Sequence, residues 1–333
     1  MAGYLSFRFG IEIELLLTSR SKNHKSWKSL ASELSIRLDG AGIPNHLNES
    51  NDSSPENYVE WSITQEVTIP PQVGKNQWGL ELVSPIYTPT DGWSTHLSLI
   101  FRVLKTYFTV TPSAHCSTHV HLSTSPPLQP VHLSSIAKAV LYFEPALDSL
   151  LPPDRATSYW CQSNRTNPVL KPLSLAQCFE YLDACAYPPQ GAGTHDVVRA
   201  MCLFPARSAY GRAHGFTEDF VHGVYKWDFS GLILPHEGGQ GKGTLEFRQA
   251  PGSRSAEDVR TWVELAVAFA AGAVDVSADG YVTDTGGVGL DPNKRVRMED
   301  LWWILSVGAQ SSGIGDLRGV EKLFVQTGKR GSK

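Results

Sequence analysis

The sequence predicts an α+β protein, in which β-strands and helices alternate along 333 residues. Two patterns support this class. In several short stretches apolar and polar residues alternate with a period of two, as they do in half-buried strands. In longer stretches apolar residues recur at helical spacing. The length fits one large domain or two ordinary ones.

The first elements follow from these patterns. Apolar and polar residues alternate along 6–17, which predicts a strand with Glu12 and Glu14 on its polar face. A helix is expected over 26–40, where leucines recur at helical spacing before Gly40. The polar stretch 44–57 is expected to form a surface loop. Two strands follow, joined by the hairpin-like PPQVGKNQ, over 58–69 and 78–86.

The central region alternates helix, strand and helix. Helices are expected over 93–108 and 131–150, and Pro145 should kink or break the second one. Between them, residues 115–123 (HCSTHVHLS) form a short strand pattern, with His119 and His121 on one face.

The remaining elements are predicted from weaker patterns. Helices are expected over 174–186 and 194–203, and strands over 224–234 and 243–249. A long helix is expected over 255–273, and two short helices after about 294. The glycine-rich HEGGQGKG connects the two strands. It is not a Walker A loop, because the spacing and the Ser or Thr after the lysine are missing.

Composition excludes several function classes. The net charge is −4, the pI is about 6.3, and no basic stripe is present, so we expect no nucleic-acid partner. No apolar run of 18 residues occurs, and the N-terminal stretch contains Arg8 between its apolar residues, so we expect a cytoplasmic protein without a membrane partner. The five cysteines form no CxxC pair and are expected to be reduced thiols.

The polar faces of the predicted strands are unusually acidic. They carry five carboxylates and two imidazoles but one guanidinium, on Glu12, Glu14, Glu66, Glu81, His119, His121, Glu246 and Arg248. If these strands are neighbours, repulsion should raise the carboxylate pKa values unless cations are bound. Three interpretations remain open: a solvated sheet face, a zinc hydrolase site, and a magnesium site for a nucleotide triphosphate.

Four segments in this order resemble a known family: FGIEIELLL, GLELVSPI, HCSTHVHLS and GTLEFRQAPGS. They are similar to the amidoligases of the glutamine synthetase and glutamate–cysteine ligase superfamily. The resemblance covers about residues 5–270, with a C-terminal loop and helices over 274–333, and implies a single catalytic domain over 1–333. It also implies a curved antiparallel sheet, with an active site on the concave face and helices on the other side.

The resemblance also implies the chemistry. Such enzymes bind ATP with two or three Mg²⁺ ions, for which Mn²⁺ can substitute, and transfer the γ-phosphoryl group to a carboxylate. An amine then attacks the acyl phosphate and forms an amide. The expected partners are small carboxylate and amine substrates, and the expected assembly is a monomer or a small homo-oligomer.

Site residues are carried over by position within the matching segments. The resemblance implies metal ligands at Glu12, Glu14, Glu81, His119 and Glu246. His121 and Ser123 match positions near the nucleotide, and Arg248 matches the arginine that contacts the transferring phosphate or the substrate carboxylate. We expect the metal ligands to share one cleft.

Three further assignments rest on less. Glu66 is a catalytic candidate, although ITQEVTIPP stands where bacterial relatives often carry Asp-Gly-Ser. Lys226 and Arg165 are candidates for holding a substrate carboxylate or phosphate, although such cations are mostly solvated. A catalytically silent protein that binds ATP and Mg²⁺ is the alternative function, with a zinc hydrolase as a distant third.

Overall fold

The computed structural model describes residues 5–50, 52, 54–187, 193–235, 239, 241–278 and 290–331. The chain divides into two compact units. Unit 2 consists of Arg8–Val120 and Ala250–Glu264. Unit 1 consists of Met1–Phe7, His121–Gln249 and Leu265–Lys333.

Unit 2 is built on a mostly antiparallel sheet. Its strands are β1 (Ser6–Ser19), β2 (Asn45–Leu47), β3 (Trp61–Gln65), β4 (Trp78–Val83), β5 (Phe108–Thr111) and the first half of β6 (Ser117–Ser125). The order is β2-β3-β4-β1-β6, and β5 also pairs with β1. In the antiparallel register of β1 and β4, Glu14 lies opposite Glu81. Only the β2–β3 pairing among these registers is parallel.

The alternation of β1 separates an apolar face from an acidic one. Ile11, Ile13 and Leu15 are completely buried or nearly so. Helix α1 (Trp27–Asp39) contacts β3 and β4 and also contacts α2 (Trp93–Tyr107). Since Ile13 lies opposite the buried Leu82, the apolar face continues across the two strands and directs Glu12 and Glu14 to the other face.

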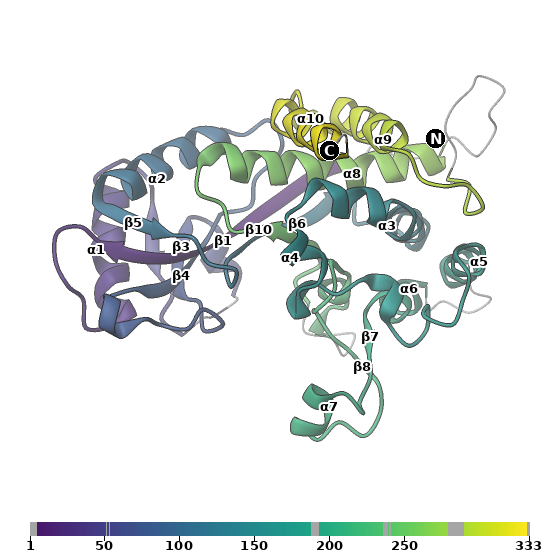
Figure 1. The fold of residues 1–333 in the computed structure, drawn as a ribbon, viewed down its shortest axis with the longest axis horizontal. Coiled ribbons are helices and arrows are strands. Elements are labelled where there is room, and N and C mark those ends of the chain that lie inside the picture. Colours follow the sequence, from purple (N-terminus) through teal and green to yellow (C-terminus); the bar gives the residue numbers. More distant parts are fainter. Residues whose placement is uncertain are drawn as a thin grey trace. The chain divides into compact units, whose positions relative to one another are not determined.

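Unit 1 is mainly helical. Its helices are α3 (Pro130–Leu150), α4 (Pro153–Ala156), α5 (Leu175–Ala186), α6 (Gly193–Cys202), α7 (Ala209–Ala213), α9 (Met298–Ser312), α10 (Arg318–Gly331) and the second part of α8 (Ala256–Ala278). Figure 1 shows α8, α9 and α10 gathered together, and both α9 and α10 contact α3.

Short strands complete unit 1. The second half of β6 is followed in sheet order by β10 (Leu245–Pro251) and β9 (Trp227–Asp228), and β7 (Leu203–Phe204) pairs with β8 (Phe220–Val221). The antiparallel register of β9 and β10 places Glu246 opposite Asp228. Short 3₁₀ turns lie at Pro55–Tyr58, Val73–Lys75, Tyr159–Cys161, Asn164–Thr166 and Ser230–Leu232.

The structure confirms the α+β class and the mostly antiparallel pairing. The major helices and the strands at 6–17, 78–86, 115–123 and 243–249 are confirmed, with ends shifted by a few residues. The likeness to the glutamine synthetase fold and the single-domain assignment stay predictions. The predicted loop over about 274–294 lies partly outside the described residues, because 279–289 are not described.

Two expectations about individual elements are wrong, and a third is wrong in one of its two alternatives. The predicted strand 224–234 contains only the two-residue β9 and a 3₁₀ turn, because Phe229–Leu232 turn the chain after a short pairing with β10. The predicted loop 44–57 contains β2, which pairs with β3. Pro145 does not break its helix, because α3 continues through it and burial of both flanking turns outweighs the lost backbone hydrogen bond. The alternative, a kink at Pro145, stays a prediction.

The five cysteines are free and buried, as expected for reduced thiols. Across the described residues, none of the helices is long and apolar enough to cross a membrane.

The packing of α8 against α9 requires a glycine. A Cβ atom added at Gly308 would collide with the backbone carbonyl oxygen of Ala268 and with the backbone nitrogen of Gly272. Because both contacts are backbone atoms of a helix, they cannot move aside as a flexible side chain would. The two helices can therefore approach this closely only without a side chain at residue 308.

This contact predicts the stability of one variant. Gly308→Ala should lower the free energy of unfolding by about 1–3 kcal/mol, because overpacking at a helix contact forces the backbones apart. The measurement is urea unfolding followed by circular dichroism. Gly328→Ala on α10 is the matched control, since an added Cβ there meets nothing within 4 Å. Equal stability of the two variants would contradict this account of the helix contact.

Candidate functional site

In unit 2, carboxylates and a histidine from three strands converge. Glu14 on β1, Glu81 on β4 and His119 on β6 each offer a ligand atom, and these atoms lie within 4.8 Å of one another. Glu12 joins them, since its Oε2 lies 3.3 Å from Nδ1 of His119. We call Glu12, Glu14, Glu81 and His119 the acidic cluster. The register of β1 and β4 produces it, because directly opposed residues present their side chains on one face.

Ser117 connects the members of the acidic cluster. Its backbone N–H and its hydroxyl both donate to Oε2 of Glu14 at 2.7 Å. The same hydroxyl oxygen lies 2.7 Å from Nε2 of His119. Since the hydroxyl hydrogen already points to Glu14, the hydroxyl oxygen accepts a hydrogen bond from the Nε2–H of His119. Ser117 therefore fixes the orientation of both the carboxylate and the imidazole.

Glu14 is held in an environment that disfavours its charge. It is 6% exposed, and burial raises its pKa above the ordinary value of 4.5. His119 and the Ser117 hydrogen bonds act in the opposite direction, and the nearby charge of Glu66 adds to the rise. A small apolar cluster of Leu16, Ile69 and Cys116 lies in the same unit. Burial, assisted by the charge of Glu14, raises the pKa of Cys116 to about 12.

The donor set fits a hard divalent cation. Three carboxylates and an imidazole approach one another, and a buried carboxylate with a raised pKa is relieved by a cation. Mg²⁺ and Mn²⁺ prefer carboxylate oxygens and accept imidazole less readily, whereas zinc accepts both. Glu12, Glu14, Glu81 and His119 are thus the residues of unit 2 that could hold a metal.

In unit 1, a second group of predicted site residues lies on β6 and β10. Nε2 of His121 lies 3.7 Å from Oε1 of Glu246, and a guanidinium N–H of Arg248 donates to the same oxygen at 2.6 Å. Nδ1 of His121 lies 3.3 Å from the hydroxyl of Thr244. Arg155 supports β10 from behind by donating to the carbonyl oxygens of Arg248 and Gln249 at 2.9 and 3.1 Å.

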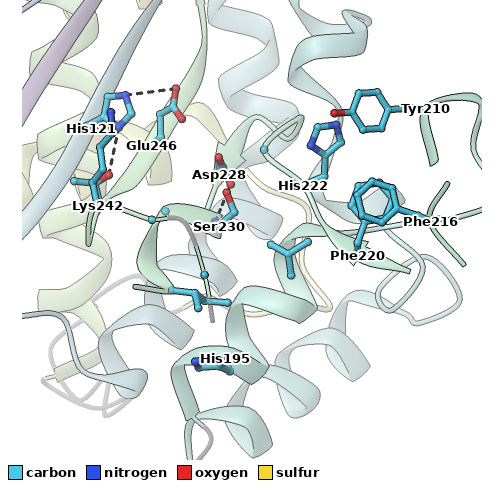
Figure 2. A pocket seen from close by; sticks show the side chains of 17 residues that line it. His121, His195, Tyr210, Phe216, Phe220, His222, Asp228, Ser230, Lys242 and Glu246 are labelled. Carbon is cyan, nitrogen blue, oxygen red and sulfur yellow. Dashed lines mark hydrogen bonds and ion pairs between the residues drawn. The ribbon is translucent and has the colours of Figure 1, made fainter. Parts of the chain in front are cut away.

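His121 and Glu246 line a cavity of about 650 Å³ within unit 1. Figure 2 shows that its walls differ in character. His121 and Glu246 lie at one end, the rings of Tyr210, Phe216, Phe220 and His222 lie at the other, and Asp228 lies between. The volume is in the range of cavities that bind small molecules.

Glycines allow one wall of this cavity to be backbone. The N–H groups of Gly241 and Gly243 donate to the carbonyl oxygens of Ile233 and Gly231 at 2.9 and 2.8 Å. A Cβ added at Gly241 would collide with the Gly231 carbonyl group. The glycine-rich segment, which lacks the Walker A spacing, thus serves to bring two backbone segments together beside the cavity.

Comparison with known proteins identifies the family. A family model described as "Putative amidoligase enzyme" matches residues 5–181, which is more than half of the chain. The chain belongs to this amidoligase family. Membership indicates an enzyme that forms amide bonds. None of the curated proteins matches the sequence.

The amidoligase match includes the acidic cluster, His121 and Ser123 but ends before Glu246 and Arg248. The structure brings together Glu12, Glu14, Glu81 and His119 in unit 2, and His121, Glu246 and Arg248 in unit 1. Their assignment to a single cleft stays a prediction. Ser123 is half-buried on β6, two residues beyond His121.

The less certain candidates occupy different environments. Glu66 follows β3 directly, accepts the Thr68 N–H at 2.6 Å and lies close enough to influence Glu14. Lys226 is 2% exposed and its ammonium donates to Glu144 at 3.0 Å and to Asp148 at 2.7 Å. Arg165 donates to the Leu173 carbonyl oxygen at 2.9 Å and to Cys178. The side chains of Lys226 and Arg165 therefore donate hydrogen bonds to other residues of the protein in this structure.

Sequence reasoning missed several residues of the two sites. The strand pattern over 115–123 predicts that Ser117 lies on the same face as the histidines. It does not predict the contact of Ser117 with Glu14. Asp228 lies in the predicted strand 224–234, but nothing in that pattern marks it as a site residue. The aromatic residues at the end of the cavity come from the middle region, where no motif was recognised.

The raised pKa of Glu14 predicts how metal-free stability depends on pH. The folded amidoligase holds this proton more tightly than the unfolded chain, so its stability should fall as the pH rises from about 4.5 through the raised pKa. Glu14→Gln should lack this part of the fall. The measurement is urea unfolding in EDTA at several pH values, with the exposed Glu218→Gln as control. If the stability of Glu14→Gln follows the wild-type pH dependence, the raised pKa assigned to Glu14 is wrong.

Proposed function

We propose that this amidoligase joins a carboxylate, such as that of an amino acid, to an amine with consumption of ATP. The observation that carries the proposal is the acidic cluster, in which Glu14 is buried beside Glu81 and His119 with its pKa raised. Such an arrangement is costly for a protein that only needs a polar sheet face, and it is what metal-assisted phosphoryl transfer requires.

The proposed reaction has two steps. First, a carboxylate oxygen of the donor attacks the γ-phosphorus of ATP, the bond to the bridging oxygen breaks, and ADP and an acyl phosphate form. Second, the amine nitrogen attacks the acyl carbon and the carbon–oxygen bond to phosphate breaks. The incoming ammonium gives up two protons in all. One is retained by the released phosphate and the other passes to solvent.

The proposal assigns Glu12, Glu14, Glu81 and His119 to metal binding, with Glu246 as a further ligand. Bound Mg²⁺ would supply positive charge to the phosphate oxygens of ATP. Ser117 then acts as a positioning residue, because it fixes Glu14 and His119 at 2.7 Å through its hydroxyl. The charge of Glu66 acts on this cluster by helping to raise the pKa of Glu14.

Arg248 is assigned to the transferring phosphoryl group or the substrate carboxylate. A guanidinium presents a planar pair of N–H donors that matches either oxyanion. Its contact with Glu246 at 2.6 Å holds it beside a residue that lines the cavity. His121 and Ser123 are assigned to the nucleotide. Lys226 contributes indirectly, since it anchors the chain before β10 to Glu144 and Asp148 on α3.

The direct test is to incubate the protein with Mg-ATP and pools of amino acids and amines. ADP, phosphate and a new amide should appear together. Glu12→Gln and Glu246→Gln should each lower turnover by at least about 10²-fold while the fold is retained, because each removes a charge that the transition state requires. Near-normal ADP release in both variants would contradict the site assignment. Tight stoichiometric zinc without ATP affinity would instead support the hydrolase.

Arg248→Lys tests the role of the guanidinium. The variant keeps the positive charge but loses the planar pair of donors, so kcat should fall by about 10²-fold with little change in thermal stability. Arg254→Lys is the matched control, because Arg254 is exposed. The measurement is steady-state amide formation. A variant with the activity of the control would show that Arg248 contributes charge alone.

A further inference from the structure

Asp228 is a buried carboxylate that faces the cavity of unit 1. It is 7% exposed, and Oδ1 accepts the N–H of Ser230 at 2.7 Å and the S–H of Cys202 at 3.6 Å. Both donors are neutral, and within the described part of the chain no lysine or arginine forms an ion pair with Asp228. A carboxylate buried to this extent normally has a cation beside it.

The surroundings of Asp228 increase the need for a positive charge. Glu246 lies directly opposite on β10, and opposed like charges on neighbouring strands repel. The guanidinium of Arg248 approaches Glu246 at 2.6 Å and compensates that carboxylate, and Nε2 of His121 lies 3.7 Å from the same oxygen. His222 also lines the cavity, but burial lowers its pKa below the ordinary 6.5 and the charge of Arg248 lowers it further, whereas the charge of Asp228 acts in the opposite direction.

Stacked rings line the same cavity as Asp228. The Tyr210 ring stacks on His222 with centroids 4.5 Å apart, and the Phe216 ring stacks on Phe220 at 3.8 Å. All four line the cavity, and Phe216 is 43% exposed. Figure 2 shows them together on the far side of Asp228 from His121 and Glu246. Aromatic rings accept apolar and aromatic groups, and their faces also attract organic cations.

We infer that this cavity binds the acceptor amine of the reaction, and that the acceptor is an organic ammonium carrying an aromatic or broad apolar group. The ammonium lies at Asp228 and the apolar group against Tyr210, Phe216 and Phe220. This inference rests on the proposed function for the word acceptor. The ligand chemistry itself rests on the buried carboxylate and the rings, which need neither ATP nor a metal.

The volume supports a ligand of this size. A cavity of about 650 Å³ has room for an arylalkylamine and leaves its polar end, with His121 and Glu246, for other reactants. Lys242 is exposed and also lines this cavity. A ligand carboxylate close to the nitrogen would be repelled by the carboxylate of Asp228. The inference therefore favours amines without such a carboxylate.

The test is isothermal titration calorimetry of the full chain at neutral pH without ATP or metal. Three probes separate the contributions: 2-phenylethylamine, its neutral counterpart 2-phenylethanol, and n-propylamine, which lacks the ring. 2-Phenylethylamine should bind at least about tenfold more tightly than either of the others, because only it satisfies both the carboxylate and the rings. Equal binding of the amine and the alcohol, or of the two amines, would overturn the inference.

Two variants locate the binding. Asp228→Asn keeps an oxygen for the Ser230 N–H but should bring the affinities of 2-phenylethylamine and 2-phenylethanol together. Glu218→Gln, an exposed charge change in the same unit, should leave the two affinities different.

Phe216→Leu should weaken the binding of 2-phenylethylamine several-fold and leave the binding of n-propylamine unchanged. Tyr181→Leu is its matched control, because Tyr181 is 42% exposed and lies outside the cavity. Unchanged binding in both cavity variants would overturn the inference.

Turnover distinguishes this inference from the proposed function. With Mg-ATP and a pool of carboxylates, 2-phenylethylamine should appear in the amide product. Amide formation with other amines but not with arylalkylamines would overturn the inference and leave the ligase function standing. Binding as expected, with no ATP consumed for any acceptor, would overturn the ligase function, and the role as acceptor with it, while the class of ligand would stand.

Discussion

Burial of the apolar face of β1 determines the direction of the acidic side chains. Ile11, Ile13 and Leu15 are packed against the protein interior, so the residues between them must point the other way. Glu12 and Glu14 occupy those positions. Pairing with β4 then sets Glu14 opposite Glu81, and the first half of β6 adds His119. A slip of one residue in this register would bury the carboxylates in the core.

The same geometry creates an electrostatic cost that the protein partly relieves with Ser117. Two hydrogen bonds from one serine stabilise the charge of Glu14, yet its pKa remains raised because burial is the larger influence. The proposed function would use this imbalance. A site that disfavours its own charge binds a cation more strongly, and in the proposed reaction that cation would attract the phosphate groups of ATP.

The main feature of unit 1 is its cavity, which is built from other kinds of residue. There the chain builds a cavity from a glycine-rich backbone wall, a buried carboxylate and stacked rings. These residues come from short elements of the middle region, where neither the strand nor the helix pattern is strong. Lys226 and Arg155 position this region by binding Asp148 and the backbone of β10, which explains two buried cations that never face the cavity.

The sequence alone determined the α+β class, the major helices, most strands and the acidic face of β1, because periodicity depends only on which residues are apolar. It also carried the amidoligase resemblance through short motifs on those strands. Tertiary structure alone decided the contacts of Ser117, the burial that raises the pKa of Glu14, and the placement of Asp228, Tyr210 and Phe216 around one cavity. Those depend on residues distant in the chain, whose approach is set by strand register and loop packing, which local pattern does not encode.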